Sequence, residues 1–532
     1  MNKYWRTGEP CVWATGAALA VTLLIAATLI VVILVNGLGV FWPSHLEKLE
    51  LKDGTSALGE QVQREEVFQG EGLRYQYKVG NRDLYGLDFR WIDEAAVAKR
   101  SRPEDAIALE REEYGNFYGF LKNLELKNLA NPGNGDAYSS LLLALQQVKE
   151  MKAAVQDMDA AISSLSYKME TLRRKILQAE YQGARADDPA LLELQRKLAI
   201  LQDDFQHLVE AQNHESSAMR SYSATFADVN GQKREIALAD IVDIYQPNRM
   251  STLQKIGFYL AKLKDLIVGE PRESNTEGGL FPAIFGTIML IFIMSLFSFP
   301  LGVIAAIYLR EYAREGVVVR LVRIAVNNLA GIPSIVYGIF GLGFFVYGIG
   351  STIDQIFFPE MLPTPTFGTG GILWASLTLA LLTVPVVIVS TEEALGAIPR
   401  EMREGSLALG STKFQTLMRI LLPMASPGIM TGLILSMARA AGEVAPLMIT
   451  GVVKLAPSLP LDGNFPFLHL DRKFMHLGFH IFDIGFQSPN VEAAKPMVFV
   501  TTLLLVLIVL TMSSIAIYLR NRMKKRYTFS TF

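Results

Sequence analysis

Residues 12–41 read VWATGAALAVTLLIAATLIVVILVNGLGVF and contain no charged side chain. About 20 such residues suffice to cross the roughly 30 Å hydrocarbon core of a bilayer. A secretory signal peptide is the alternative, because Lys3 and Arg6 precede the run, but the apolar core of a signal peptide has only about 7–15 residues. The length of the run therefore predicts a retained membrane anchor.

Five further apolar stretches follow a long polar gap, which gives six predicted spans. They are residues 280–309, 321–349, 371–390, 429–452 and 496–519. When six spans are threaded, four segments rich in Lys and Arg fall on one side, and positive charge collects on the cytoplasmic side of a membrane. These segments are Met1–Arg6, Arg310–Arg323, Thr391–Leu422 and Arg520–Arg526. We therefore expect both termini in the cytoplasm.

This topology places residues 44–279 outside the membrane, between an N-terminal unit (1–43) and a five-helix membrane core (280–532). Apolar residues recur at helical spacing from 138 to 222, interrupted by the breaker and capping residues GARADD at 183–188. On either side, LRYQYKV, LDFRWID and REIALADIVDIY alternate apolar and polar residues as strands do. The pattern predicts an α+β domain in which a long helical hairpin projects from a β-rich base. We interpret the apolar stripes of the hairpin as its own seam rather than as a docking face.

The composition excludes several classes of function. Half of the 532 residues are apolar and 19% are charged, which argues against a purely soluble or disordered protein. Lys and Arg (50) nearly balance Asp and Glu (52), which gives no overall attraction to nucleic acid. The single cysteine, Cys11, excludes an internal disulfide framework and a multi-cysteine metal cluster.

The loop between the fourth and fifth spans, residues 391–428, carries the most local pattern. Residues 402–409 suit a short helix, Gly410 stands where a left-handed helix stop is needed, and Thr412 with Gln415 forms a T-x-x-Q capping box. Pro423 is expected to end the second helix. Two short helices around a glycine turn make a compact knob that a cytoplasmic partner can grip. The spacing alone leaves open a connector that has no partner.

The residue order of this knob resembles the E-A-A-x(3)-G-x(9)-I-x-L-P loop of ABC importer permeases, which docks on the ATPase subunit. The positions that carry the resemblance are Glu404, Gly405, Ser406, Gly410, Ile420, Leu422 and Pro423. Gly405 and Ser406 stand where the family usually has alanine. Both residues are small, so docking is still expected, although glycine costs a helix roughly 1 kcal/mol relative to alanine.

Three more stretches are similar to the PstA-type permease of phosphate importers. They are NLAGIPSIVYGIFGLGFFV (328–346), STEEALGAIP (390–399) and ARAAGEVAPLMITG (438–451). The resemblance implies the type I ABC importer permease fold and a place in the bacterial inner membrane, with residues 44–279 in the periplasm. It also implies three partners: a homologous PstC-type permease, a dimer of ATP-binding subunits and an outer phosphate-binding protein. It says little about residues 44–279, which short members of the family lack.

Arg439 and Glu443 are the two charges that lie deep in a predicted span. Arg439 is about 15 Å along the helix from Ile429, near mid-bilayer, where an ion costs at least roughly 2.5–3.5 kcal/mol. The four-residue spacing predicts that both side chains share one helix face. A mutual ion pair that only locks the bundle is the alternative to a role in the transport path. The resemblance marks this R-A-x-G-E motif as important for transport, and Pro446 is expected to kink the helix just beyond it.

Two absences narrow the chemistry. The sequence contains no Gly-Lys dipeptide and hence no G-x-x-x-x-G-K-[ST] phosphate loop, so we expect no enzyme activity and no ATP or other cofactor in this chain. His469, His476 and His480 lie in the loop between the last two spans, without the pattern of a metal site. A permease for another oxyanion, such as sulfate or molybdate, stays an alternative. A membrane-anchored sensor or scaffold is a second one, although the tail after Leu519 is short for an output domain.

Overall fold

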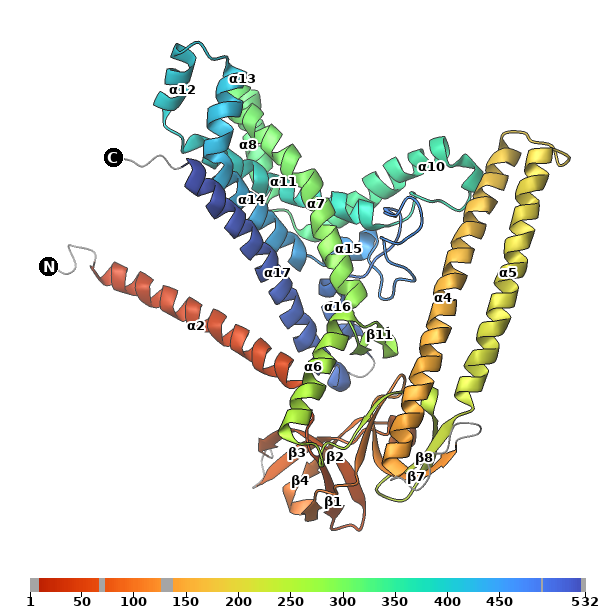
Figure 1. Ribbon diagram of the computed structural model, residues 1–532. Helices are drawn as coiled ribbons and strands as arrows, with labels where there is room; N and C mark the ends of the chain where they lie inside the picture. Colours follow the sequence, from red (N-terminus) through yellow and green to blue (C-terminus); the bar gives the residue numbers. More distant parts are fainter. Residues whose placement is uncertain (1–8, 67–71, 126–136, 489–490, 528–532) are drawn as a thin grey trace.

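The computed structural model describes residues 9–66, 72–125, 137–488 and 491–527. In this part of the chain six helices are long and apolar enough to span a membrane. They are Cys11–Gly39, Phe281–Tyr312, Ser334–Phe357, Ile372–Gly396, Lys413–Gly442 and Val491–Lys525. The chain is therefore a multi-pass membrane protein. Figure 1 shows a short pair of helices at one end of the bundle, called the α12 end below, and at the other end a β-sheet region from which a long hairpin rises, called the hairpin end.

The third span lies later in the sequence than the predicted residues 321–349. Residues 317–329 form a separate amphipathic helix, α8 (Val317–Leu329), and the span begins only at Ser334. It consists of α9 (Ser334–Phe340), the π-helical η5 (Gly341–Gly350) and α10 (Ser351–Phe357). Pro333 explains the break, because its ring disfavours a helical conformation in the preceding residue and it has no N–H to donate.

The fifth span lies earlier in the sequence than the predicted residues 429–452, and Pro423 does not end the helix before it. The helix runs from Lys413 to Gly442 through α13 (Lys413–Thr416), the π-helical η7 (Leu417–Leu421) and α14 (Leu422–Gly442). Pro423 lies in the first turn of α14, directly after η7. The wider hydrogen-bonding pattern of the π-helical turn relieves the clash that a proline makes with the turn before it.

The membrane bundle packs around α11 (Ile372–Gly396). Helices α7 (Phe281–Ile307) and α14 flank α11, and together they bury an apolar core that includes Leu290, Met294, Leu379, Leu382 and Ala440. Helix α17 (Val491–Tyr527) packs on α14. The C-terminal end of helix α2 (Glu9–Gly39) contacts α17, where Gly37 lies against Phe499 and Leu503. The remaining helical elements of the membrane half are η4 (Tyr308–Tyr312), η6 (Pro359–Met361), α12 (Arg400–Ala408), α15 (Ala445–Thr450), α16 (Leu477–Phe482) and η8 (Asp483–Gln487).

Two antiparallel five-stranded sheets form the base of the hairpin end. Their strand orders are β4-β3-β2-β1-β5 and β10-β6-β7-β8-β9. The first contains β1 (Leu46–Leu51), β2 (Ser56–Glu66), β3 (Leu73–Lys78), β4 (Phe89–Asp93) and β5 (Val97–Ser101), and the second contains β6 (Ile107–Arg111), β7 (Phe117–Glu125), β8 (Ser223–Ala227), β9 (Lys233–Ala237) and β10 (Ile241–Tyr245). The short helix α3 (Arg82–Tyr85) follows β3. Helix α6 (Thr252–Val268) and the small β11–β12 pair (Pro271–Arg272, Glu277–Gly278) lead from the base into α7.

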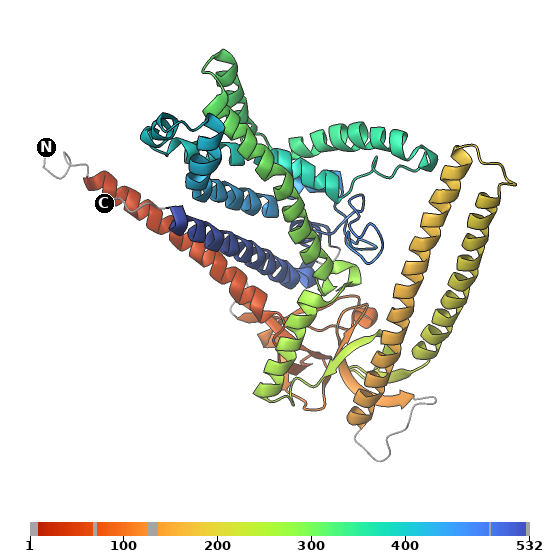
Figure 2. The same ribbon diagram turned by 45° about the horizontal axis from the view of Figure 1, so that its top comes forward.

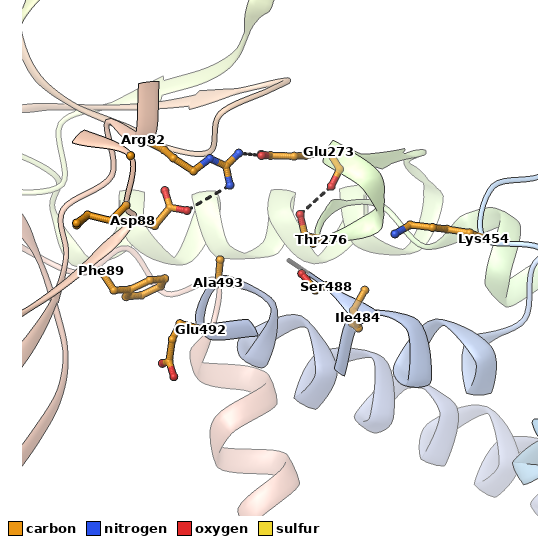
Figure 3. A pocket seen from close by; sticks show the side chains of 12 residues that line it. Arg82, Asp88, Phe89, Glu273, Thr276, Lys454, Ile484, Ser488, Glu492 and Ala493 are labelled. Atoms are coloured by element: carbon orange, nitrogen blue, oxygen red, sulfur yellow. Dashed lines mark hydrogen bonds and ion pairs between the residues drawn. The ribbon is translucent and has the colours of Figure 1, made fainter. Parts of the chain in front are cut away.

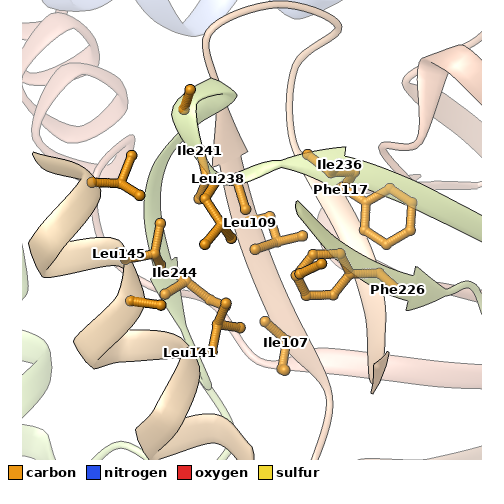
Figure 4. Packing of buried hydrophobic residues seen from close by; sticks show 14 of the residues in the cluster. Ile107, Leu109, Phe117, Leu141, Leu145, Phe226, Ile236, Leu238, Ile241 and Ile244 are labelled. Carbon is orange, nitrogen blue, oxygen red and sulfur yellow. The ribbon is translucent and has the colours of Figure 1, made fainter. Parts of the chain in front are cut away.

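The long hairpin consists of α4 (Ala137–Tyr181) and α5 (Pro189–Arg220), which pack along each other. The turn follows from local chemistry: Gly183 has a φ of 89°, and the Asp188 carboxylate caps α5 by accepting a hydrogen bond of 2.9 Å from Ala190 N–H. The base of α4 covers the second sheet, with Leu141 and Leu145 buried against it (Figure 4). Figures 1 and 2 both show the hairpin rising from the sheets beside α10.

Candidate functional site

The knob between the fourth and fifth spans has the predicted local geometry. Helix α12 is followed by Gly410, whose φ of 86° lies in the left-handed region that favours glycine. Thr412 and Gln415 form the reciprocal capping box, with hydrogen bonds of 2.9 and 3.2 Å. The predicted helix stop and capping box are therefore confirmed.

Ser406 and Gly405 have different surroundings in the knob. The Ser406 hydroxyl is buried and lies 2.9 Å from the Thr416 hydroxyl, so a hydrogen bond joins α12 to α13. A Cβ at Gly405 meets no atom within 4 Å. The serine in the usual alanine position therefore has a structural partner, whereas the glycine leaves open space on the surface of α12.

Arg403 fastens the knob to the bundle, and sequence reasoning missed it. Its guanidinium donates to the carbonyl oxygens of Ile398 and Leu395, at 2.8 and 2.6 Å, and to the carboxylate of Glu311 at 3.0 Å. Glu311 lies in η4 at the end of the second span. This charge-assisted bond links α12 to the end of that span. No local pattern pairs Arg403 with a residue so far away in the sequence.

The predicted coupling residues divide into an exposed and an inward-facing group. Glu404, Gly405 and Gly410 are exposed. Ser406 is buried, and Ile420 and Leu422 pack against the apolar cluster of Leu395, Ile398 and Leu421; Pro423 is half-buried. The structure adds an exposed apolar group that the sequence analysis did not single out: Leu407, Leu409, Phe414 and Met418. Leu409 exposes 89% of its surface at the tip, so the knob presents an unpartnered apolar face at the α12 end.

Arg439 and Glu443 lie at a break in the fifth span. Arg439 is in the last turn of α14, whereas Glu443 is the residue after the helix, with extended backbone angles. Arg439 Nε lies 3.6 Å from Glu443 Oε1, and their side chains are 31% and 18% exposed. The two charges are thus paired, but not along one helix face as expected.

The expected kink at Pro446 is a complete break instead. Helix α14 ends at Gly442, and Pro446 lies in the first turn of α15, where its missing N–H costs no hydrogen bond. Helix α9 packs tightly here, since a Cβ at Gly338 would lie 2.7 Å from Pro446 Cα. The break therefore places Arg439 and Glu443 beside irregular backbone, which membrane proteins tolerate where it is buried in protein or lines a cavity.

The three histidines of the last long loop have structural surroundings. His469 Nε2 lies 2.9 Å from Asp462 Oδ1, His476 Nδ1 accepts a hydrogen bond of 3.1 Å from Gly478 N–H, and His480 Nε2 lies 3.1 Å from the Asn275 carbonyl oxygen. Among the residues that the structure describes, no group of three His, Cys, Asp or Glu side chains is placed to hold a metal ion. These histidines contribute packing and capping.

Burial gives His476 and His480 a testable pH dependence. It lowers the pKa of His476 to about 3, and it lowers the pKa of His480 to about 4 although the Asn275 carbonyl opposes the shift. Below about pH 6.5 the unfolded chain binds protons that the folded chain excludes, so stability falls as the pH drops toward these values. We expect each histidine to cost roughly 2 kcal/mol at pH 5. Thermal unfolding of the purified protein between pH 7.5 and 5 measures this, and His476→Asn, which keeps a capping acceptor, should flatten the slope.

A cavity of about 550 Å³ separates the first sheet from the membrane bundle (Figure 3). Its cations are paired: Arg82 lies 3.3 Å from Asp88 and also contacts Glu273, and Lys454 lies 3.0 Å from Asp483. Acidic side chains outnumber the basic ones in this lining. The cavity is therefore poorly suited to an oxyanion, and we do not place substrate there.

The membrane half of the chain is similar in sequence to known transport proteins. A family model, "Binding-protein-dependent transport system inner membrane component", matches residues 298–525. "Probable ABC transporter permease protein YqgI" of Bacillus subtilis is 33% identical over 225 residues, which cover 41% of this chain and 70% of the relative. The chain belongs to this permease family. The permease's knob and its Arg439–Glu443 pair both lie inside the matched region, whereas the sheets and the hairpin lie outside it.

Two further relatives of the permease carry the name of one substrate. "Probable phosphate transport system permease protein PstA" of Methanocaldococcus jannaschii is 36% identical over 197 residues, or 36% of this chain and 63% of the relative. "Phosphate transport system permease protein PstA" of Mycobacterium leprae is 37% identical over 194 residues, or 36% and 58%. The permease thus spans less than two thirds of either relative. Among solved structures, the inward-facing methionine ABC transporter MetNI is similar with a TM-score of 0.33 at 18% identity, covering 47% of this chain and 96% of that chain.

Proposed function

We propose that this chain is the PstA-type permease subunit of an ATP-driven importer of inorganic phosphate. The observation that carries the proposal is the 36–37% identity to the two relatives named as phosphate permeases, over 197 and 194 residues in the C-terminal part of the chain. A homologous PstC-type permease, two ATPase subunits and an outer phosphate-binding protein complete the complex. The complex lies in the bacterial inner membrane, with both termini of this chain in the cytoplasm and residues 44–279 in the periplasm.

In this proposal the knob receives the movement of the ATPase. Leu409, Phe414 and the other exposed apolar side chains bind the ATPase surface, and Glu404 adds a charge at the rim. Arg403 transmits the movement, because it joins α12 to Glu311 at the end of the second span. The apolar cluster around Ile420 and Leu422 transmits it to α14. The bundle then opens alternately toward either side of the membrane.

The transport path in this proposal runs past the break between α14 and α15. The guanidinium of Arg439 offers two parallel N–H donors, which fit a phosphate oxyanion. Glu443 sets the resting position of that guanidinium through the 3.6 Å contact. Phosphate displaces the carboxylate from Arg439 as it passes, and the pair re-forms after release.

The function is tested by purification followed by transport. The tagged chain should co-purify with a second permease and an ATPase, identified by mass spectrometry. The reconstituted complex should take up radiolabelled phosphate only with internal ATP and external binding protein. Sulfate and molybdate serve as competitors: if either competes better than unlabelled phosphate, the oxyanion in the proposal is wrong. Absence of an ATPase would refute the importer itself.

The topology gives a separate prediction. In a Cys11→Ser background, Glu315→Cys lies at an exposed position of the Arg310–Arg323 segment and Gln182→Cys at the turn of the hairpin. An impermeant maleimide added to intact spheroplasts should label position 182 and should reach position 315 only after permeabilisation, because the Lys/Arg-rich loops lie inside. The reverse pattern of labelling would invert the topology.

A further inference from the structure

The two sheets at the hairpin end repeat one architecture. When β6–β10 are matched in order to β1–β5, both sheets have the order fourth, third, second, first, fifth. All paired strands are antiparallel. In both sheets a single 3₁₀ turn joins the fourth strand to the fifth, at Glu94–Ala96 and at Leu238–Asp240. The repetition therefore includes the connections as well as the strands.

The register repeats residue by residue. Gly59 of β2 and Gly119 of β7 occupy equivalent places, and each faces the backbone of the third strand. A Cβ at Gly59 would lie 2.4 Å from the Lys78 carbonyl oxygen, and one at Gly119 would lie 2.4 Å from the Ala227 carbonyl oxygen. Lys78 and Ala227 are themselves equivalent, since they pair with Glu60 and Phe120, the residues after the two glycines. The pairing then shifts in both strands, between Gln61 and Gln63 and between Leu121 and Asn123.

The buried side chains repeat as well. Equivalent positions in the two cores are Leu49 and Leu109, Tyr77 and Phe226, and Ile92 and Ile236, all at most 6% exposed. Each sheet therefore buries its own core with the same positions of the pattern. Two unrelated sheets would have no reason to share strand order, glycine position, irregular pairing and core positions together.

The repeat shows where the hairpin is inserted. In the first copy, Glu65 pairs with Arg74, and residues 66–73 connect them. In the second copy, the equivalent pair is Glu125 and Ser223, but residues 126–222 connect them. The hairpin thus takes the place of an eight-residue connection, and the strand pattern does not require it.

The distal half of α4 contacts the membrane half at its hairpin end. The Tyr167 hydroxyl donates a hydrogen bond to the Phe465 carbonyl oxygen, and its ring lies edge-on to His469 with centroids 5.6 Å apart. About two turns further on, the Arg174 guanidinium lies 5.9 Å from the Phe358 ring centroid. The hairpin therefore rests on two loops, one after α10 and one between α15 and α16.

The second of these loops, residues 459–472, is a folded unit. The Asp462 carboxylate lies 2.6 Å from Arg472 Nη1 and 2.9 Å from His469 Nε2. Burial opposes ionisation of Asp462, but hydrogen bonds from the Asn464 N–H, Arg472 and His469 outweigh it and lower its pKa to about 2. The carboxylate is therefore ionised and holds the loop together at neutral pH.

The loop is joined directly to the start of α11. Ile372 N–H donates to the Arg472 carbonyl oxygen at 2.9 Å, and Leu373 N–H donates to the Leu470 carbonyl oxygen at 3.0 Å. Helix α11 crosses the bundle and leads into α12 of the knob. Tyr167 thus touches one end of a continuous structure whose other end is the knob.

We infer that the hairpin is an insert in the second of two repeated five-stranded modules, and that Tyr167 on this insert positions loop 459–472 and, through it, the start of α11. Tyr167 is a positioning residue and contacts no substrate. The role in transport rests on the proposed function, whereas the positioning of the loop does not.

The test shortens the hairpin so that it no longer contacts the two loops, while the base of the hairpin on the second sheet is kept. Deleting residues 160–177 and 192–209 removes 18 residues from each helix. Because 18 residues make about five whole turns, the side chains on either side of the deletion keep their orientation toward the other helix. Leu141, Leu145 and the turn at 183–188 remain. Tyr167→Phe removes the hydroxyl alone. Tyr181→Phe is the matched control, because Tyr181 is the same residue type at the exposed end of the same helix.

Hydrogen–deuterium exchange of loop 459–472 in nanodiscs is the first readout. Loss of one hydrogen bond worth about 1 kcal/mol should speed local opening of the loop about fivefold in Tyr167→Phe. The shortened hairpin should give at least that increase, and Tyr181→Phe should give none. Unchanged exchange of the loop with the shortened hairpin would overturn the inference.

Phosphate uptake by the assembled complex is the second readout. We expect the shortened hairpin to lower the maximal rate several-fold and leave the half-saturating phosphate concentration unchanged, because the loop guides movement of α11 rather than binding. If the wild-type complex takes up no phosphate, the proposed function fails while the exchange result still decides the positioning. If exchange changes but uptake kinetics do not, the role of Tyr167 in transport is refuted.

Discussion

Gly410→Val should abolish ATPase docking while the membrane bundle still inserts and folds. The Gly410 backbone has a φ of 86°, and a non-glycine residue in that region costs about 1–2 kcal/mol, with β-branched side chains at the upper end. No atom lies within 4 Å of the position of its Cβ, so the effect arises from backbone strain and not from a clash. Because Gly410 sets the angle between α12 and the capped start of α13, relief of this strain moves Leu409 relative to Phe414.

Two matched variants show whether the effect comes from backbone strain at Gly410 or from the loss of any glycine in the knob. Gly410→Asn should retain most docking, because asparagine tolerates the left-handed region. Gly405→Ala should dock normally and stabilise α12 by about 1 kcal/mol, since its Cβ enters open space inside a helix. The measurement is the amount of ATPase recovered with the tagged permease, together with uptake. Full recovery of ATPase by Gly410→Val would show that the knob does not need this turn.

The parts of the knob that sequence predicts are those that local chemistry determines. Thr412 and Gln415 are three residues apart, and the capping box needs nothing beyond that spacing. The bond between Arg403 and Glu311 joins residues 92 positions apart, so it depends on how the second span packs beside α12. A single sequence holds no signal for such a pair.

The predicted boundaries of the third and fifth spans are wrong for a related reason. Apolar content locates a span, but the helix ends depend on how breaks are accommodated. Pro333 ended a helix, as expected of a proline, whereas Pro423 did not, because η7 precedes it. The repeat at the hairpin end escaped sequence reasoning because the long hairpin divides the second copy and because the copies share mainly core positions such as Leu49 and Leu109.

Two variants at Arg439 and Glu443 decide whether these charges serve transport or only stabilise the bundle. The Arg439–Glu443 contact is 3.6 Å long and the guanidinium is about a third exposed, so the pair contributes at most about 1 kcal/mol to stability. Replacing both residues by glutamine leaves no uncompensated ion, which is the main cost of breaking a buried pair. We therefore expect the Arg439→Gln, Glu443→Gln double variant to assemble at wild-type levels.

Uptake then decides whether Arg439 serves the substrate. If its guanidinium binds phosphate, Arg439→Lys should assemble normally and transport poorly, because an ammonium keeps the charge but loses the planar pair of donors that fits an oxyanion. Loss of one bidentate contact worth roughly 1.5–3 kcal/mol corresponds to an uptake decrease of about tenfold or more. The double glutamine variant should be at least as impaired. Phosphate uptake in proteoliposomes, normalised to assembled complex, is the measurement. Near wild-type uptake by the double variant would make the pair structural and remove both residues from the transport path.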